Sequence, residues 1–219
     1  MNTLRRFAVA ALFLALGCTS TAPVNMKEPR RVVGTEDAVR VDAEIRSDEM
    51  RSGVAVPIVV EITNHRSEPI AIADIVSETT YDRETHTVTV NVGSEMPGAT
   101  LLPRLIAIGP GEKKVITTSA RLAYMAAQAP TDKAARTRFP NALRLKVSFL
   151  GDTKPFAELV GIAQKAVNDP KRADELFPIW LEHTEVVYTN TVPMRWSGPV
   201  MGGEPSMTAP SVRRRTTRG

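Results

Sequence analysis

Cys18 is the one cysteine in this chain of 219 residues. A lone thiol can act as a nucleophile, form half of an intermolecular disulfide, or serve as a point of covalent attachment. No cysteine follows it, so the folded body has neither an internal disulfide nor a cysteine ligand for a metal. We therefore expect burial and hydrogen bonds to stabilise the body, and the role of Cys18 to lie at the N-terminus.

Three histidines, His65, His86 and His183, are the other residues best suited to acid–base or metal chemistry. No two of them have the spacing of a local metal site, and no H-E-x-x-H, G-x-S-x-G or phosphate-binding glycine motif occurs. His86 and His183 have acidic neighbours, so the alternative is a site assembled in space from these two and a carboxylate. The sequence predicts no catalytic residue, no metal ligand and no cofactor, and a protein that is not an enzyme.

Two further groups have ligand chemistry but unsuitable spacing. Carboxylates gather in residues 47–50 and 80–86, and neither segment has the regular oxygen spacing of a calcium loop. Met194, Met201 and Met207 offer thioethers that suit Cu(I), yet they lie six or seven residues apart and without a histidine. We expect solvated loops at the acidic segments and no copper site at the methionines.

The N-terminus has the pattern of an export signal. Arg5 and Arg6 precede an uninterrupted apolar run, residues 7–16. That run is about half the ~20 apolar residues of a membrane-spanning helix, and small residues follow it, as in a cleaved signal peptide. The sequence therefore predicts export.

The end of this segment reads Leu14-Ala15-Leu16-Gly17-Cys18 and resembles the lipobox of bacterial lipoproteins, with the aliphatic residue displaced by one position. The resemblance implies that residues 1–18 are a signal peptide, that Cys18 is lipidated, and that the protein is anchored to a membrane of the cell envelope. Thr19 stands where an aspartate would favour the inner membrane, so the resemblance implies the outer membrane, facing the periplasm. The alternative is an ordinary cleaved signal in which Cys18 has no special role.

The net positive charge of the chain comes from its two ends. Of 28 lysines and arginines, six lie in the signal and in the last nine residues, which leaves 22 basic against 24 acidic residues in between. The body therefore lacks the basic surface of a nucleic-acid-binding protein. We expect residues 199–219 to form a disordered tail in which Arg213, Arg214 and Arg215 can contact an anionic polymer or lipid headgroups.

Period-two alternation of apolar and polar residues dominates the rest of the chain. In residues 39–45, Val39, Val41, Ala43 and Ile45 share one face, and polar residues share the other. Similar runs separated by turn residues predict seven or eight short strands in an all-β sandwich. The predicted strands fall within residues 39–45, 56–64, 70–76, 85–92, 101–122, 142–150 and 184–196.

Residues 56–72 resemble the B-to-C hairpin of immunoglobulin-like domains in bacterial surface proteins. The resemblance implies an immunoglobulin-like antiparallel β-sandwich, which we place at residues 37–198, after a flexible tether over residues 19–36. Helical spacing of apolar residues over 155–169 predicts a helical insertion at about 153–182, before the last strand. We expect Trp180 to pack this insertion onto the sandwich.

These observations favour a membrane-anchored, non-enzymatic binding or structural module of the cell envelope. Sandwich domains bind partners through end loops or strand edges. The candidate contacts are the turn that contains Asn64, His65 and Arg66, the loop over residues 93–99, and the helical insertion; the partner is the membrane through Cys18, with an envelope protein or anionic polymer as a further partner. The alternative is an envelope hydrolase or metal-binding protein with a site built from dispersed residues.

Overall fold

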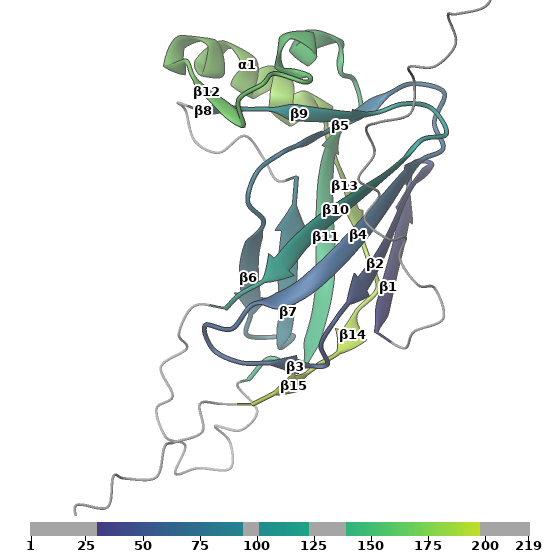
Figure 1. The fold of residues 1–219 in the computed structure, drawn as a ribbon, viewed down its shortest axis with the longest axis vertical. Coiled ribbons are helices and arrows are strands. Elements are labelled where there is room, and N and C mark those ends of the chain that lie inside the picture. The colour runs from purple at the N-terminus through teal and green to yellow at the C-terminus, as the bar shows by residue number, and fades with distance from the viewer. Residues whose placement is uncertain (1–29, 94–100, 123–138, 198–219) are drawn as a thin grey trace, which may run out of the picture.

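A computed structural model describes residues 30–93, 101–122 and 139–197 of the chain, and these form a mostly β structure with two larger sheets (Figure 1). The first sheet has the order β1 (Arg31–Glu36), β2 (Val39–Ile45), β4 (Val56–Asn64), β10 (Lys113–Ala120). The second has the order β6 (Glu78–Asp82), β7 (Thr87–Val92), β11 (Ala142–Leu150), β5 (Ile70–Ala73), β9 (Leu105–Ile108), with β13 (Thr184–Tyr188) and β14 (Val192–Pro193) also paired to β11. Two small sheets join β12 (Ala166–Asn168) to β8 (Leu101–Pro103) and β15 (Arg195–Trp196) to β3 (Glu49–Met50).

The two larger sheets share one hydrophobic core. The alternation in β2 places Val39, Val41, Ala43 and Ile45 inward, each at most 1% exposed. Their cluster also contains inward residues of β4, β7 and β11, so side chains from both sheets pack together between them. The predicted strand character and inward face of residues 39–45 are confirmed.

The sequence predicted antiparallel pairing throughout, and the structure differs from this prediction. β11 pairs in parallel with β7 over six residue pairs, and β15 pairs in parallel with β3. A parallel pair needs a long crossover connection, and the chain between β7 and β11 supplies one. The described residues also hold fifteen strands rather than seven or eight: residues 101–122 and 184–196 each divide into three shorter strands, and β1, β3, β6 and β12 lie outside the predicted runs.

The predicted tether is too long at its C-terminal end. Residues 31–36 form β1, which pairs with β2, and Val32 is fully buried in the core. Gly34 makes this strand possible, because a Cβ there would lie 2.4 Å from the carbonyl oxygen of Tyr188 on β13. Residues 19–29, like the basic tail at 199–219, lie outside the described residues.

The insertion before the last strands is present, but its helix lies elsewhere. Residues 155–169, predicted as helix, instead contain a short 3₁₀ helix, η3 (Lys154–Leu159), and the strand β12. The α-helix is α1 (Pro170–His183), which continues past the exposed Pro178. Asp169 begins it, accepting a hydrogen bond from the backbone N–H of Arg172 at 3.0 Å, and Pro170 suits the first turn.

Trp180 holds this insertion, which we call the helical cap (residues 154–183), against the second sheet. Its side chain is 2% exposed, and its ring meets that of Phe156 edge-on with centroids 5.3 Å apart. Their cluster includes Ala71 of β5 and Leu150 of β11. The expected packing role of Trp180 is confirmed, and Figure 1 shows the cap at one end of the sheets, with β3 and β15 at the other. Among the described residues, no helix is both long and apolar enough to cross a membrane.

Candidate functional site

Asn64, predicted to contact a partner, is buried and part of the framework instead. It is 0% exposed, and its Nδ2 donates to the carbonyl oxygens of Glu68 at 2.9 Å and Ile108 at 3.0 Å. Its Oδ1 accepts from the backbone N–H of Arg66 at 2.9 Å. The prediction of a contact role for Asn64 is therefore wrong, because its carboxamide satisfies buried backbone groups that would otherwise lack partners.

Arg66, in the same turn, is engaged within the protein. Its guanidinium binds both carboxylate oxygens of Glu185 on β13, donates to the carbonyl oxygen of Asp37 at 2.7 Å, and lies over the Phe149 ring at 5.2 Å. The hydrogen bond to Glu185 raises the pKa of Arg66. Only His65 has an exposed side chain among the three predicted contacts of this turn, so its role stays a prediction.

His86 and His183 do not form a common site. The backbone N–H of Asn141 bonds to the carbonyl of His86, and the backbone N–H of Gly151 bonds to that of His183. The nine residues of β11 lie between these two contacts, so the histidines are about 30 Å apart. Across the described part of the chain, no three His, Cys, Asp or Glu side chains gather closely enough to hold a metal ion.

Three carboxylates of the acidic segments, Asp48, Glu49 and Asp82, have hydrogen-bond partners. Asp82 accepts from the backbone N–H of Glu84 and the hydroxyl of Thr85, both at 2.8 Å, and these bonds, the one from Thr85 first, lower the pKa of Asp82. In the other loop, Asp48 accepts from Arg195 at 2.7 Å and Glu49 from Arg51 at 3.0 Å. These oxygens shape turns and bind arginines. The expectation of solvated loops is wrong in part, because residues 80–82 belong to β6 and residues 49–50 form β3.

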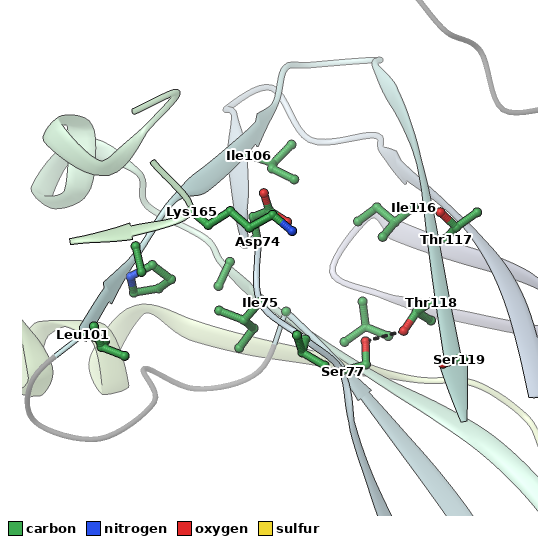
Figure 2. Close-up of a pocket in the computed structure, with 16 residues that line it drawn as sticks. Asp74, Ile75, Ser77, Leu101, Ile106, Ile116, Thr117, Thr118, Ser119 and Lys165 are labelled. Atoms are coloured by element: carbon green, nitrogen blue, oxygen red, sulfur yellow. Dashed lines mark hydrogen bonds between the residues drawn. The ribbon is translucent and has the colours of Figure 1, made fainter. Parts of the chain in front are cut away.

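A groove at the open side of the two sheets is the best candidate for a binding site. It has a volume of about 590 Å³ and lies between β10 and the segment that connects β5 to β6 (Figure 2). Four consecutive residues of β10, 116–119, line one wall, and five consecutive residues, 73–77, line the other. Neighbouring strand residues point to opposite faces, so a wall of consecutive residues means that the groove follows the strand's edge.

The groove lining combines aliphatic side chains with a few polar and charged ones. Figure 2 shows Ile75, Ile106 and Ile116 around the opening. At one end, the Thr118 hydroxyl donates to the Ser77 hydroxyl at 2.6 Å, which closes the gap between the walls.

Asp74 and Lys165 also line the groove, and Figure 2 shows them between Ile106 and Ile75, with Leu101 farther out. Arg104 donates from Nε to Asp74 at 3.0 Å, and from a second guanidinium nitrogen as well, so this carboxylate is already neutralised. Lys165 is exposed and forms no ion pair with another residue that the structure describes. Lys165 therefore brings to the groove a positive charge that is not paired with any described carboxylate.

Comparison with protein families, curated proteins and solved structures finds no match for this chain. The site must therefore be judged on its own chemistry. The described residues that line the groove include no histidine or cysteine, and the hydroxyls of Thr118 and Ser77 bond to each other. A groove with apolar walls and a few polar groups is suited to binding a ligand.

Sequence reasoning missed this groove. Of the regions expected to contact a partner, only Gly93 from the loop over 93–99 and two residues of the cap, Lys165 and Ala166, line it; residues 94–99 of that loop lie outside the described residues. The walls come from segments about forty residues apart, each of which reads as an ordinary strand or connector. Val76, which ends the predicted strand over residues 70–76, is 88% exposed in the structure, and no feature of the sequence indicates that exposure.

Proposed function

We propose that this protein is an exported lipoprotein, anchored to the cell envelope through Cys18, whose immunoglobulin-like sandwich is a non-enzymatic binding module. The groove between β10 and residues 73–77 is the observation that carries the binding part of the proposal. A shared core between two sheets supports the sandwich architecture, and the parallel pairing of β7 and β11 distinguishes it from an all-antiparallel one.

The position of Cys18 supports an anchor near the body. Twelve residues separate it from Arg31, where the first strand begins. Even a fully extended chain of this length spans at most about 45 Å. A lipidated Cys18 would therefore hold the groove close to the membrane surface. Two or more acyl chains give stable attachment, since each buried methylene contributes ~0.8 kcal/mol.

The anchor is tested by mass spectrometry and membrane fractionation of the native protein and of Cys18→Ala. The native chain is expected to begin at an acylated Cys18 and to sediment with membranes, and Cys18→Ala to lose both properties. Ser20→Ala is the matched control and should behave as the native chain. An unacylated, soluble native protein would contradict the proposal.

The outer-membrane location has its own test. If the residue after the lipidated cysteine directs sorting, Thr19→Asp should move the protein to the inner membrane, while Thr19→Ser should leave it in the outer one. Density-gradient separation of the two membranes measures this. Identical distribution of the two variants would contradict sorting by residue 19.

A further inference from the structure

The edge of β10 that faces the groove has no strand partner among the described residues. β10 ends its sheet and pairs only with β4, through all eight of its residues. Its other edge lies along the groove, where residues from both faces of the strand are exposed to the opening. An unpaired strand edge presents a row of N–H and C=O groups that a second extended chain can bind.

The opposite wall has unpaired backbone too. Residues 74–77 connect β5 to β6 without belonging to a strand, and Asp74 alone among them forms a backbone hydrogen bond, to the carbonyl of Arg104 at 2.8 Å. The backbone groups of Ile75, Val76 and Ser77 form none with other described residues. An aliphatic ligand would leave all these polar groups buried without partners, which is costly, whereas an extended peptide would satisfy them.

The bond between Thr118 and Ser77 sets where such a peptide can lie. Below it, the N–H of Arg121 also bonds to the Thr79 hydroxyl at 3.1 Å, so the two walls are joined there. The edge left open is therefore residues 113–117 of β10, of which Ile116 and Thr117 line the groove and residues 113–115 continue the same unpaired edge beyond it. At about 3.4 Å per residue, five residues extend roughly 17 Å, the length of an ordinary strand.

The charged side chains near the groove indicate one feature of the peptide that it can bind. Lys114 on β10 and Lys165 on the cap form no ion pair with described residues, whereas Lys113 is bound to Glu61 at 2.9 Å. The lining acid, Asp74, is paired with Arg104. Lys165 thus places one unmatched ammonium group in the groove, and Lys114 places another on the strand edge that continues from it; both complement an acidic side chain.

We propose that the free edge of β10 binds an extended, acidic segment of a partner polypeptide by strand pairing. Its backbone bonds to residues 113–117, its aliphatic side chains pack against Ile75, Ile106 and Ile116, and an acidic residue lies beside Lys165. This rests on the binding function proposed above and names the class of its ligand.

The test uses the full acylated chain in lipid nanodiscs and a fluorescent peptide of alternating valine and threonine with two terminal glutamates. Amide hydrogen exchange of β10 and fluorescence anisotropy are measured. We expect the peptide to slow exchange over residues 113–117 at least tenfold. The same peptide with alternate amides N-methylated should bind at least tenfold more weakly, since methylation removes the donors that strand pairing needs.

Charge is tested in the same assay. Lys165→Glu should weaken binding about tenfold at low salt, and a peptide with lysines in place of glutamates should then bind the variant better than the native protein. Lys154→Glu, at an exposed lysine on η3 outside the groove, is the matched control and should change nothing.

Equal binding of the methylated and unmethylated peptides, or slowed exchange with empty nanodisc lipid alone, would overturn strand pairing. No binding of any acidic peptide would overturn it as well. These results leave the envelope-anchored binding module standing, because acylation and membrane location are read out separately with Cys18→Ala.

Discussion

Arg66 connects three parts of the molecule through one side chain. It joins its own turn to Glu185 on β13, to the carbonyl of Asp37 between β1 and β2, and to the face of Phe149 on β11. A planar guanidinium suits this combination, because it can bind a carboxylate with two parallel N–H groups and stack on a ring at once. A turn that the sequence marks as a surface contact is thus fixed to the framework.

Replacing Arg66 should therefore destabilise the fold. Arg66→Met is expected to lower the free energy of unfolding by about 1–3 kcal/mol, because it leaves Glu185 partly buried without its partner. Arg66→Lys should recover less than half of the loss, since an ammonium cannot make the two-pronged contact. Urea unfolding of both variants measures this, and full recovery by lysine would show that charge alone is needed.

The lowered pKa of Asp82 makes the stability of the fold depend on pH. Its pKa is lower in the folded protein, chiefly because of the hydrogen bond from Thr85, so ionised Asp82 stabilises the fold above its unfolded pKa. That stabilisation is lost as the pH falls through the lower, folded pKa. In Thr85→Val the NMR-measured pKa of Asp82 should rise toward the ordinary value of an aspartate, and acid unfolding should show less loss of stability from this group.

Glu84→Gln is the control for this prediction, because it removes a neighbouring exposed carboxylate and keeps the backbone N–H that binds Asp82. Its Asp82 pKa should stay lowered. An unchanged Asp82 pKa in Thr85→Val would show that the hydroxyl is not the main cause.

At the scale of the elements, the helical cap depends on one buried face of α1. Trp180 is 2% exposed and Phe177, on the same helix, is 41% exposed. Trp180→Ala should lower the free energy of unfolding by about 3–5 kcal/mol through the cavity it leaves, and Phe177→Ala by less than about 1 kcal/mol. Equal losses in denaturant unfolding would mean that the cap is not held by the Trp180 cluster.

Local patterns predicted the strands well and the cap poorly. Strict alternation over residues 39–45 predicted a strand and the face that it buries, because period two has one simple solution beside a core. Residues 155–169 have apolar residues at helical spacing but do not form an α-helix. Gly161 adopts a φ of +69°, which is not helical, and β12 pairs with β8, a strand far away in the sequence. Such distant pairing overrides local spacing and has no local sequence signal.

Local sequence patterns could not predict the candidate site, for a similar reason. Asn64 occupies a polar turn, where side chains are usually exposed, and only the structure shows that its amide bonds to the Ile108 carbonyl. The groove needs β10 and the β5–β6 connector to face each other with their edges unpaired. Neither segment carries a binding motif; the two exposed lysines of β10 are typical of an edge strand but do not indicate which segment lies beside it.

The whole molecule combines a proposed lipid anchor near the N-terminus with a groove at the open side of two sheets. The central claim is that the anchored protein binds an envelope partner through this groove. A photo-crosslinking residue in place of Val76, which lines the groove and is 88% exposed, tests it in intact cells. Val54, 52% exposed and outside the groove lining, is the matched control position.

We predict one discrete crosslinked product from position 76, reduced in Lys165→Glu and lost in Cys18→Ala, and no such product from position 54. No product from position 76, or the same products from both positions regardless of Cys18, would contradict the claim.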